Sequence, residues 1–112
     1  MENHIRQHSI VYQAFSPMEA EIRIKVEVDY FNDTTEVRGR LVGPRCALAS
    51  TVEVAYPLRP VKESAGTSRI LRAVVPEPNR WSQETPFLYR AIIELWQDES
   101  RCDRVEFDHG FT

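Results

Sequence analysis

The chain has 112 residues, of which 42% are hydrophobic and 28% charged, which is enough for one domain with a single core. Its 14 Lys and Arg against 17 Asp and Glu give a net charge of −3, without the basic stripe that nucleic acid or an anionic membrane surface requires. No apolar run approaches the roughly 20 residues of a membrane span, and residues 1–10 lack the apolar stretch of a signal peptide. The compartment stays open, with a cytoplasmic location slightly favoured.

The first third of the chain contains the clearest strand pattern. Residues 1–9 are polar and we expect them to fray, whereas "SIVYQAFS" (9–16) predicts a first strand. In "EIRIKVEVDYF" (21–31) apolar residues alternate with charged ones. This period of two is typical of an antiparallel strand that buries one face and exposes the other to water. The segment therefore predicts a strand that lies against the core.

Five further strands follow, separated by turn residues. The segments are "EVRGRLVG" (36–43), "STVEVAYPL" (50–58, ending at Pro57), "RILRAVV" (69–75), "FLYRAIIELW" (87–96) and "CDRVEFDHGF" (102–111). Residues 59–68 are polar and predict an exposed loop. Alternation predicts the core residues Ile22, Ile24, Val26, Val28, Val37, Leu41, Val54, Ile70, Val74, Tyr89, Ala91, Ile93, Leu95 and Phe107.

Seven short strands without a helix predict an all-β fold. We expect an immunoglobulin-like β-sandwich of about seven antiparallel strands, with residues 1–112 as a single domain. Cys46 and Cys102 permit one disulfide and require none.

The segment from Pro78 to Trp96 approaches a strand through an unusual run of Pro, Trp and Ser. Tyr89 stands near the start of that strand, where a tyrosine hydroxyl can bond backbone across the corner between two sheets. Trp81 is predicted to cap the open end of the sandwich, and its replacement by Ala to cost about 3–5 kcal/mol. Glu84 is a candidate acceptor for backbone N–H groups in the crossover. On this interpretation the segment is a rigid structural corner.

The same segment resembles a motif of glycoside hydrolase family 2, especially of β-galactosidases. In that family the immunoglobulin-like domain carries P-x-L-W-S-x-E-x-P-x-L-Y and ends in G-F-R. The matching residues are Pro78, Trp81, Ser82, Glu84, Pro86, Leu88 and Tyr89, followed by Asp108, Gly110 and Phe111. Two positions depart from the pattern, since Arg80 replaces the Leu and Thr112 the Arg. The motif covers about the last third of the chain.

The resemblance implies a structural role. Family 2 enzymes combine a jelly-roll sugar-binding domain, this immunoglobulin-like domain and a catalytic barrel. Retaining hydrolysis uses two carboxyl groups about 5 Å apart, and in the family both belong to the barrel. The resemblance therefore implies no catalytic residue and no cofactor in this chain. It implies a non-catalytic spacer that braces the barrel of a β-galactosidase-like enzyme, with the barrel and the sugar-binding domain as partners.

Other functions rest on smaller sets of residues. Glu84 with Glu77, or Asp98 with Glu99, are candidate acid/base pairs, although turns or solvated edges explain them better. His4, His8 and His109 are weak metal-ligand candidates, as are Asp98, Glu99, Asp103 and Asp108 for calcium, because neither set has the spacing of a site. Trp96 and Tyr56 are the candidate contacts for a glycan, in a free-standing module that binds carbohydrate or protein.

Overall fold

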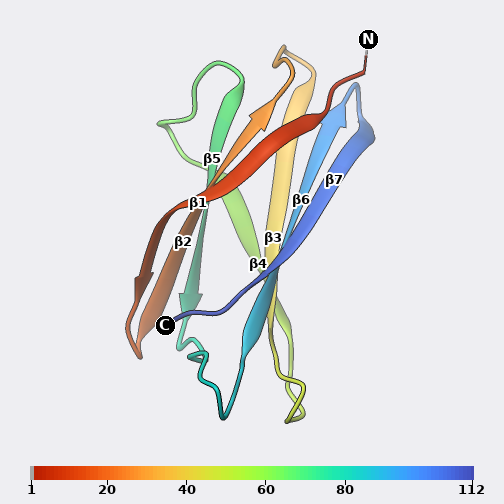
Figure 1. Ribbon diagram of the computed structural model, residues 1–112. Coiled ribbons are helices and arrows are strands. Elements are labelled where there is room, and N and C mark those ends of the chain that lie inside the picture. The colour runs from red at the N-terminus through yellow and green to blue at the C-terminus, as the bar shows by residue number, and fades with distance from the viewer. Residues whose placement is uncertain (1) are drawn as a thin grey trace.

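The computed structural model describes residues 2–112, which form seven antiparallel strands and no helix (Figure 1). Hydrogen bonds join the strands into one curled sheet in the order β1-β2-β5-β4-β3-β6-β7. In chain order they are β1 (Ile5–Phe15), β2 (Glu19–Val28), β3 (Thr35–Arg45), β4 (Val54–Pro60), β5 (Ser68–Pro76), β6 (Leu88–Gln97) and β7 (Ser100–His109). The all-β, sandwich-like fold expected from the sequence is confirmed. Among these residues there is no helix that could cross a membrane.

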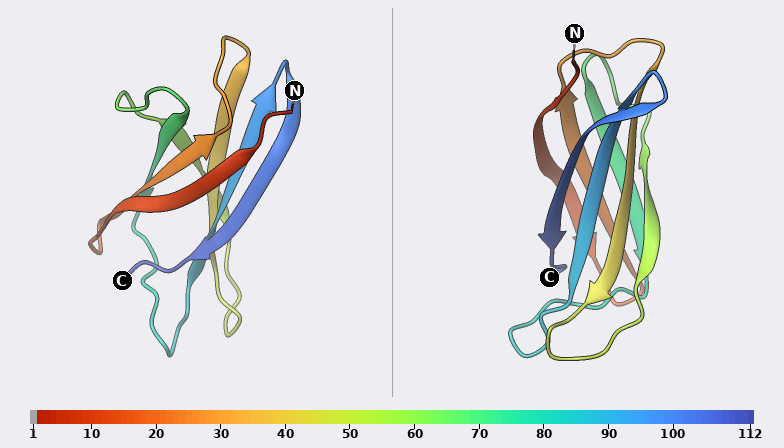
Figure 2. Two further views of the ribbon diagram at one scale, coloured as in Figure 1. Left: turned by 45° about the horizontal axis from the view of Figure 1, so that its top comes forward. Right: turned by 90° about the vertical axis from the view of Figure 1, so that its right-hand side faces the viewer.

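The sheet curls into two facing layers, β1-β2-β5 and β4-β3-β6-β7 (Figure 2). Strand β4 makes the connection, because it pairs with β3 from Gly39↔Leu58 to Gly43↔Val54 but with β5 only at Arg59↔Arg72 and Pro60↔Leu71. The two edge strands are β1 and β7. They meet near the N-terminus, where the Ile5 N–H donates to Asp103 Oδ2 (2.7 Å), and then diverge (Figures 1 and 2).

The core lies between the layers and follows the predicted alternation in β2, β3 and β6. Its buried residues are Ala20, Ile22, Ile24, Val26, Val28, Val37, Leu41, Leu58, Leu71, Ala73, Val75, Tyr89, Ala91, Ile93, Leu95 and Phe111. Phe107, predicted to be buried, is partly buried and packs against this cluster.

The predicted inward face of β5 is wrong by one residue. Ile70 and Val74 are only half-buried, whereas Leu71 and Val75 face the core. Leu71 pairs with Ile24, which itself points inward, and this pairing fixes the register. Because "RILRAVV" carries apolar residues at both odd and even positions, alternation could not distinguish its two faces.

Strand β4 also departs from the prediction. Val54, expected in the core, is 45% exposed, and Leu58 is buried in its place. The strand continues past Pro57 to Pro60. Because β4 makes few pairs with β5, it can include residues that donate no backbone hydrogen bond.

The expected fraying of residues 1–9 is wrong from Asn3 onward, while residue 1 lies outside the described part of the chain. Asn3 is 1% exposed. Its Nδ2 donates to Tyr30 O (2.8 Å), and its Oδ1 accepts from the Tyr30 N–H (3.2 Å). Residues from Ile5 onward then pair with β2. The Asn3 side chain therefore ties the start of the chain to Tyr30, just beyond the end of β2.

Candidate functional site

The motif residues lie in and beside the corner loop, which we define as residues 77–87 between β5 and β6. Trp81 and Pro86 form an isolated bridge across this loop. Between them the Ser82 N–H donates to Thr85 O (3.1 Å), and the Thr85 N–H donates to Ser82 Oγ (3.1 Å). Glu84 is exposed, and these bonds of the turn come from Ser82 and Thr85. Glu84 was expected to accept backbone N–H groups here, and this expectation is wrong. Ser82 Oγ, three residues before Thr85, takes the place of the carboxylate as the acceptor of the Thr85 N–H.

Tyr89 ties β6 to the corner loop. Its ring is buried in the core, and its hydroxyl accepts a hydrogen bond from the Asn79 N–H at 2.9 Å. Burial raises the pKa of the Tyr89 hydroxyl, so the group stays neutral. Its ring meets the edge of Phe111 at a centroid distance of 5.2 Å. The corner contact expected from the sequence is therefore present, with Asn79 as its backbone partner.

Trp81 lies over the end of the chain. Its backbone N–H donates to Phe111 O at 2.8 Å. A Cβ placed on Gly110 would come within 2.8 Å of Trp81 Cβ, Cγ and Cδ1. Trp81 is 37% exposed, so it covers the C-terminal residues with one side and meets solvent with the other. It is a partial cap of this end of the sandwich.

The remaining motif residues, Pro78, Pro86 and Leu88, are half-buried around the same loop. The structure therefore brings the motif residues of the corner loop together with Tyr89, Gly110 and Phe111, whereas Asp108 pairs with Arg90 on the outer face of β7. Sequence reasoning missed Thr85 and Asn79. The Ser-x-x-Thr spacing of Ser82 and Thr85 is a recognisable turn signal, whereas Asn79 participates through its backbone and leaves no signal in the sequence.

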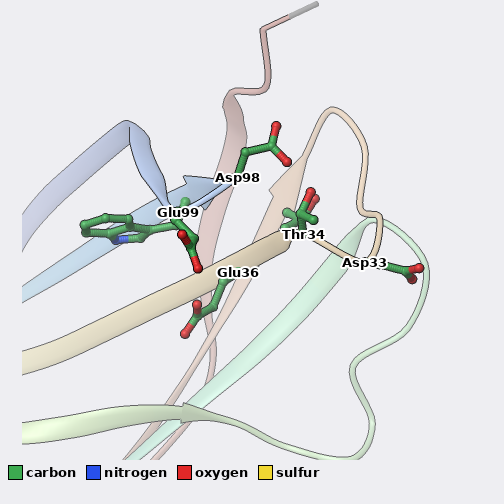
Figure 3. A pocket seen from close by; sticks show the side chains of 7 residues that line it. Asp33, Thr34, Glu36, Asp98 and Glu99 are labelled. Carbon is green, nitrogen blue, oxygen red and sulfur yellow. The ribbon is translucent and has the colours of Figure 1, made fainter.

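A second feature is an open pocket at the opposite end of the molecule, with a volume of about 530 Å³ (Figure 3). It lies between the β2–β3 turn and the β6–β7 turn, and is lined by Asp33, Thr34, Thr35, Glu36, Trp96, Asp98 and Glu99. Asp98 and Glu99 adopt positive φ angles of 52° and 65° in the second turn. Four carboxylates and one indole make this pocket acidic.

Trp96 is held on the outer face of β6 beside this pocket. The Arg38 guanidinium stacks over its ring at 4.2 Å, and its indole N–H donates to Glu94 Oε1 at 3.4 Å. The hydrogen bond from Arg38 holds the pKa of Glu36 below its usual value. Burial acts against the ionised form of Glu94, yet hydrogen bonds from Arg101 and Trp96 still lower its pKa. Both shifts favour the ionised forms of Glu36 and Glu94.

The two candidate glycan contacts are not brought together. Trp96 lies opposite Glu36 on β3, whereas Tyr56 lies opposite Leu41, an odd number of residues away. Because successive residues of a strand face opposite sides, the two rings point to different faces of the layer. Tyr56 is half-buried against the core and its ring lies 6.5 Å from that of Tyr89. A paired aromatic platform is absent at these positions.

The remaining candidate residues are dispersed. Among residues 2–112, no three His, Cys, Asp or Glu side chains gather where they could hold a metal ion. His8 stacks on Phe107 (5.1 Å), while Asp103 binds the Ile5 N–H and Asp108 pairs with Arg90. His4 lies beside Asp29, and His109 beside Phe111.

Two further pairs named from the sequence, Glu77 with Glu84 and Cys46 with Cys102, form no site. Glu77 and Glu84 are exposed residues of the corner loop. Cys46 is buried and Cys102 exposed, and both are free thiols. The disulfide that the sequence permits is not formed.

Comparisons with known proteins agree with the motif. The model of the family described as "Glycosyl hydrolases family 2" matches residues 3–111. A β-galactosidase of Alteromonas mediterranea is 28% identical over 97 residues, which are 84% of this chain and 8% of that protein. A β-glucuronidase from Ruminococcus gnavus matches 98% of this chain and 16% of its own, with a TM-score of 0.60 and 17% identity.

A β-glucuronidase of Bifidobacterium dentium, solved with coumarin-3-O-glucuronide, has a TM-score of 0.63 and 14% identity. This match covers 98% of the chain and 17% of the enzyme. At such identities the two glucuronidases establish the fold alone. The chain spans less than a fifth of the length of each of these relatives.

Proposed function

The chain belongs to glycosyl hydrolases family 2, and we propose that it acts as a non-catalytic structural domain which braces the catalytic barrel of a longer glycosidase. The observation that carries this proposal is the extent of the matches. Nearly the whole chain corresponds to a small part of much longer glycosidases. We propose further that the parent enzyme hydrolyses O-glycosyl bonds in the manner of a β-galactosidase.

The acidic pocket is poorly suited to glycoside hydrolysis. A retaining enzyme needs one carboxyl group with a raised pKa, which protonates the leaving group, and a second that attacks the sugar. The pKa of Glu36 is shifted in the opposite direction by Arg38. Asp98 and Glu99 stand exposed at the tip of a hairpin, where water competes for every bond. These features favour a domain that contributes no catalytic group.

The distribution of exposed side chains supports a bracing role. Ion pairs such as Arg72–Glu21 and Arg90–Asp108 lie on the outer faces of the two layers. Large apolar side chains are exposed on strands β1 and β4, at Ile10, Val11, Tyr12 and Val54. The most exposed ones, Met18, Leu48 and Val52, lie instead in the β1–β2 turn and the loop 46–53, and Trp81 is exposed in the corner loop. These three connections lie at one end of the molecule (Figure 2). An end of the molecule with such exposed apolar side chains is suited to contact with another domain.

Activity of the chain alone tests the proposal. The purified protein is incubated with 4-nitrophenyl β-galactoside, β-glucuronide and β-mannoside, and release of nitrophenol is followed. We expect no release above buffer. Turnover that Glu36→Gln or Glu99→Gln abolishes would contradict the proposal and make the pocket an active site.

A second candidate function is carbohydrate binding at Trp96, because this indole borders an open pocket that also contains Thr34. Titration with galactosides, glucuronides, mannosides and oligosaccharides, followed by NMR chemical shifts, tests it. Saturable shifts at Trp96 that vanish in Trp96→Ala would establish a binding module. Flat titrations would leave the structural domain as the only one of the two functions still supported.

A further inference from the structure

The last residues of the chain fill the opening between the diverging edge strands. We call residues 110–112 the tail. Within the tail, Phe111 is fully buried. The centroid of its ring lies 5.2 Å from that of Tyr89 and 4.9 Å from that of His109. Gln13 Nε2, on the other edge strand, donates to Thr112 O at 3.5 Å. The tail is therefore packed between β1 and β6 although it belongs to no strand.

The corner loop fixes the tail from outside. The Trp81 N–H donates to Phe111 O (2.8 Å), and the Trp81 side chain lies so close to Gly110 that only a hydrogen atom fits between them. Tyr89 accepts a hydrogen bond from the Asn79 N–H of the corner loop, and its ring packs against the ring of Phe111. Three separate elements, namely the corner loop, β6 and β1, thus hold three consecutive residues.

We infer that the tail is a latch, seated by Trp81 and Tyr89, which gives the backbone beyond Phe111 one fixed direction. Trp81 is then a positioning residue. The inference deepens the proposed function and rests on it in one respect, namely that a catalytic domain follows the latch in the parent enzyme. A domain that braces a barrel needs a stiff exit of this kind, because a flexible exit would leave the barrel free to rotate.

The test is amide hydrogen exchange by NMR on the isolated chain. The Trp81 amide reports on the latch, since its hydrogen bond goes to Phe111 O, and the Ile93 amide in central strand β6 reports on global unfolding. Gly110→Ala inserts a methyl group against Trp81. We expect the Trp81 amide to exchange at least tenfold faster relative to Ile93 in this variant. The {¹H}-¹⁵N NOE of residues 111 and 112 should also fall.

Gly66→Ala is the matched control. It adds the same methyl group in the exposed β4–β5 loop, where no atom lies within 4 Å but a φ of +62° strains the new side chain. It should lower global stability, which speeds exchange of the Ile93 amide, without raising the Trp81-to-Ile93 exchange ratio. If Gly110→Ala fails to fold, Phe111→Leu replaces it, and the same rise in the ratio is expected.

Either of two results would overturn the inference. One is a wild-type Trp81 amide that exchanges as fast as the exposed amides of the corner loop, and the other is an unchanged ratio in the tail variant. These readouts require no sugar and no catalytic domain. Failure of the latch would therefore leave the structural-domain proposal intact, while glycosidase turnover by the chain would refute that proposal without changing the exchange result.

Discussion

The phenolic oxygen of Tyr89 accepts a hydrogen bond from the backbone N–H of Asn79, 2.9 Å away in the corner loop. The bond joins the start of β6 to the loop that precedes it, at a point where the tyrosine ring is surrounded by the core. In Tyr89→Phe the ring remains and the Asn79 donor loses its partner. We expect a loss of about 1–3 kcal/mol in the free energy of unfolding, measured by urea denaturation.

Tyr12→Phe is the control for this substitution. Tyr12 is 47% exposed and its ring contacts the Arg23 guanidinium, a contact that phenylalanine keeps. Its free energy of unfolding should stay within about 0.5 kcal/mol of wild type. Equal stabilities for Tyr89→Phe and Tyr12→Phe would mean that the corner bond contributes nothing.

Trp81→Ala should destabilise the protein by less than the sequence suggested. The estimate of about 3–5 kcal/mol applies to a fully buried tryptophan. Because Trp81 is 37% exposed, less apolar area returns to water. We expect a loss of about 2–3 kcal/mol, with a lower melting temperature. Val52→Ala is the control, and because Val52 is 85% exposed it should leave the melting temperature unchanged. An unchanged melting temperature for Trp81→Ala itself would refute the corner interpretation.

Stability should decline in mildly acidic solution because of His109. Its Nε2 is buried and has no hydrogen-bond partner among the described residues, and burial lowers the pKa of the ring below 6.5. Below pH 6.5 the His109 ring takes up a proton in the unfolded chain, whereas in the folded chain it stays neutral until a lower pH is reached. The free energy of unfolding should therefore be level above pH 6.5 and fall below it, by at most about 1.4 kcal/mol per pH unit.

Urea midpoints between pH 7.5 and 5.0 measure this effect. His109→Leu should flatten the profile over that range, whereas His8→Gln should leave its slope in place. A second decline belongs to Glu21, Glu36 and Glu94, whose pKa values are all lowered from 4.5. Hydrogen bonds from Arg72 and Arg38 lower those of Glu21 and Glu36 respectively. This decline should begin only near pH 4.5. A wild-type profile that is flat down to pH 5 would contradict the role of His109.

The sequence predicted the hydrogen bond of Tyr89 at the corner, but it did not predict the contacts that the corner makes with distant parts of the chain. Tyr89 stands near the start of a strongly alternating strand, so both its burial and the direction of its hydroxyl followed from local pattern. The contact of Trp81 with Gly110 joins residues far apart in the chain and depends on where β7 ends. Asn3 shows the same limit, because its side chain pairs with Tyr30 across the fold and its polar neighbours suggested only fraying.

The pattern also failed where both faces of a strand are apolar. In β5 the partner strand decides the register, through pairs such as Ile24↔Leu71. In the acidic pocket, two turns from distant segments come together, and although the sequence indicates each turn, it does not indicate that they lie side by side. Local periodicity can therefore assign strands, but it cannot assign contacts that arise when the sheet curls.

The register of β5 can be tested with a matched pair of truncations. Leu71 is fully buried against β2, whereas Val74 is half-buried on the outer face and pairs with Glu21. Leu71→Ala should lower the free energy of unfolding by about 2–5 kcal/mol through lost burial and a residual cavity. Val74→Ala should cost less than about 1 kcal/mol, because its methyl groups already meet solvent.

Urea denaturation at neutral pH measures both variants, and equal m-values would show that the same surface unfolds in each. The order of the two losses is the decisive quantity. A larger loss for Val74→Ala than for Leu71→Ala would place Val74 inside, as simple alternation from Ile70 predicts. Such a result would shift the pairing of β5 with β2 by one residue and turn Arg72 toward the core, where its ion pair with Glu21 could not form.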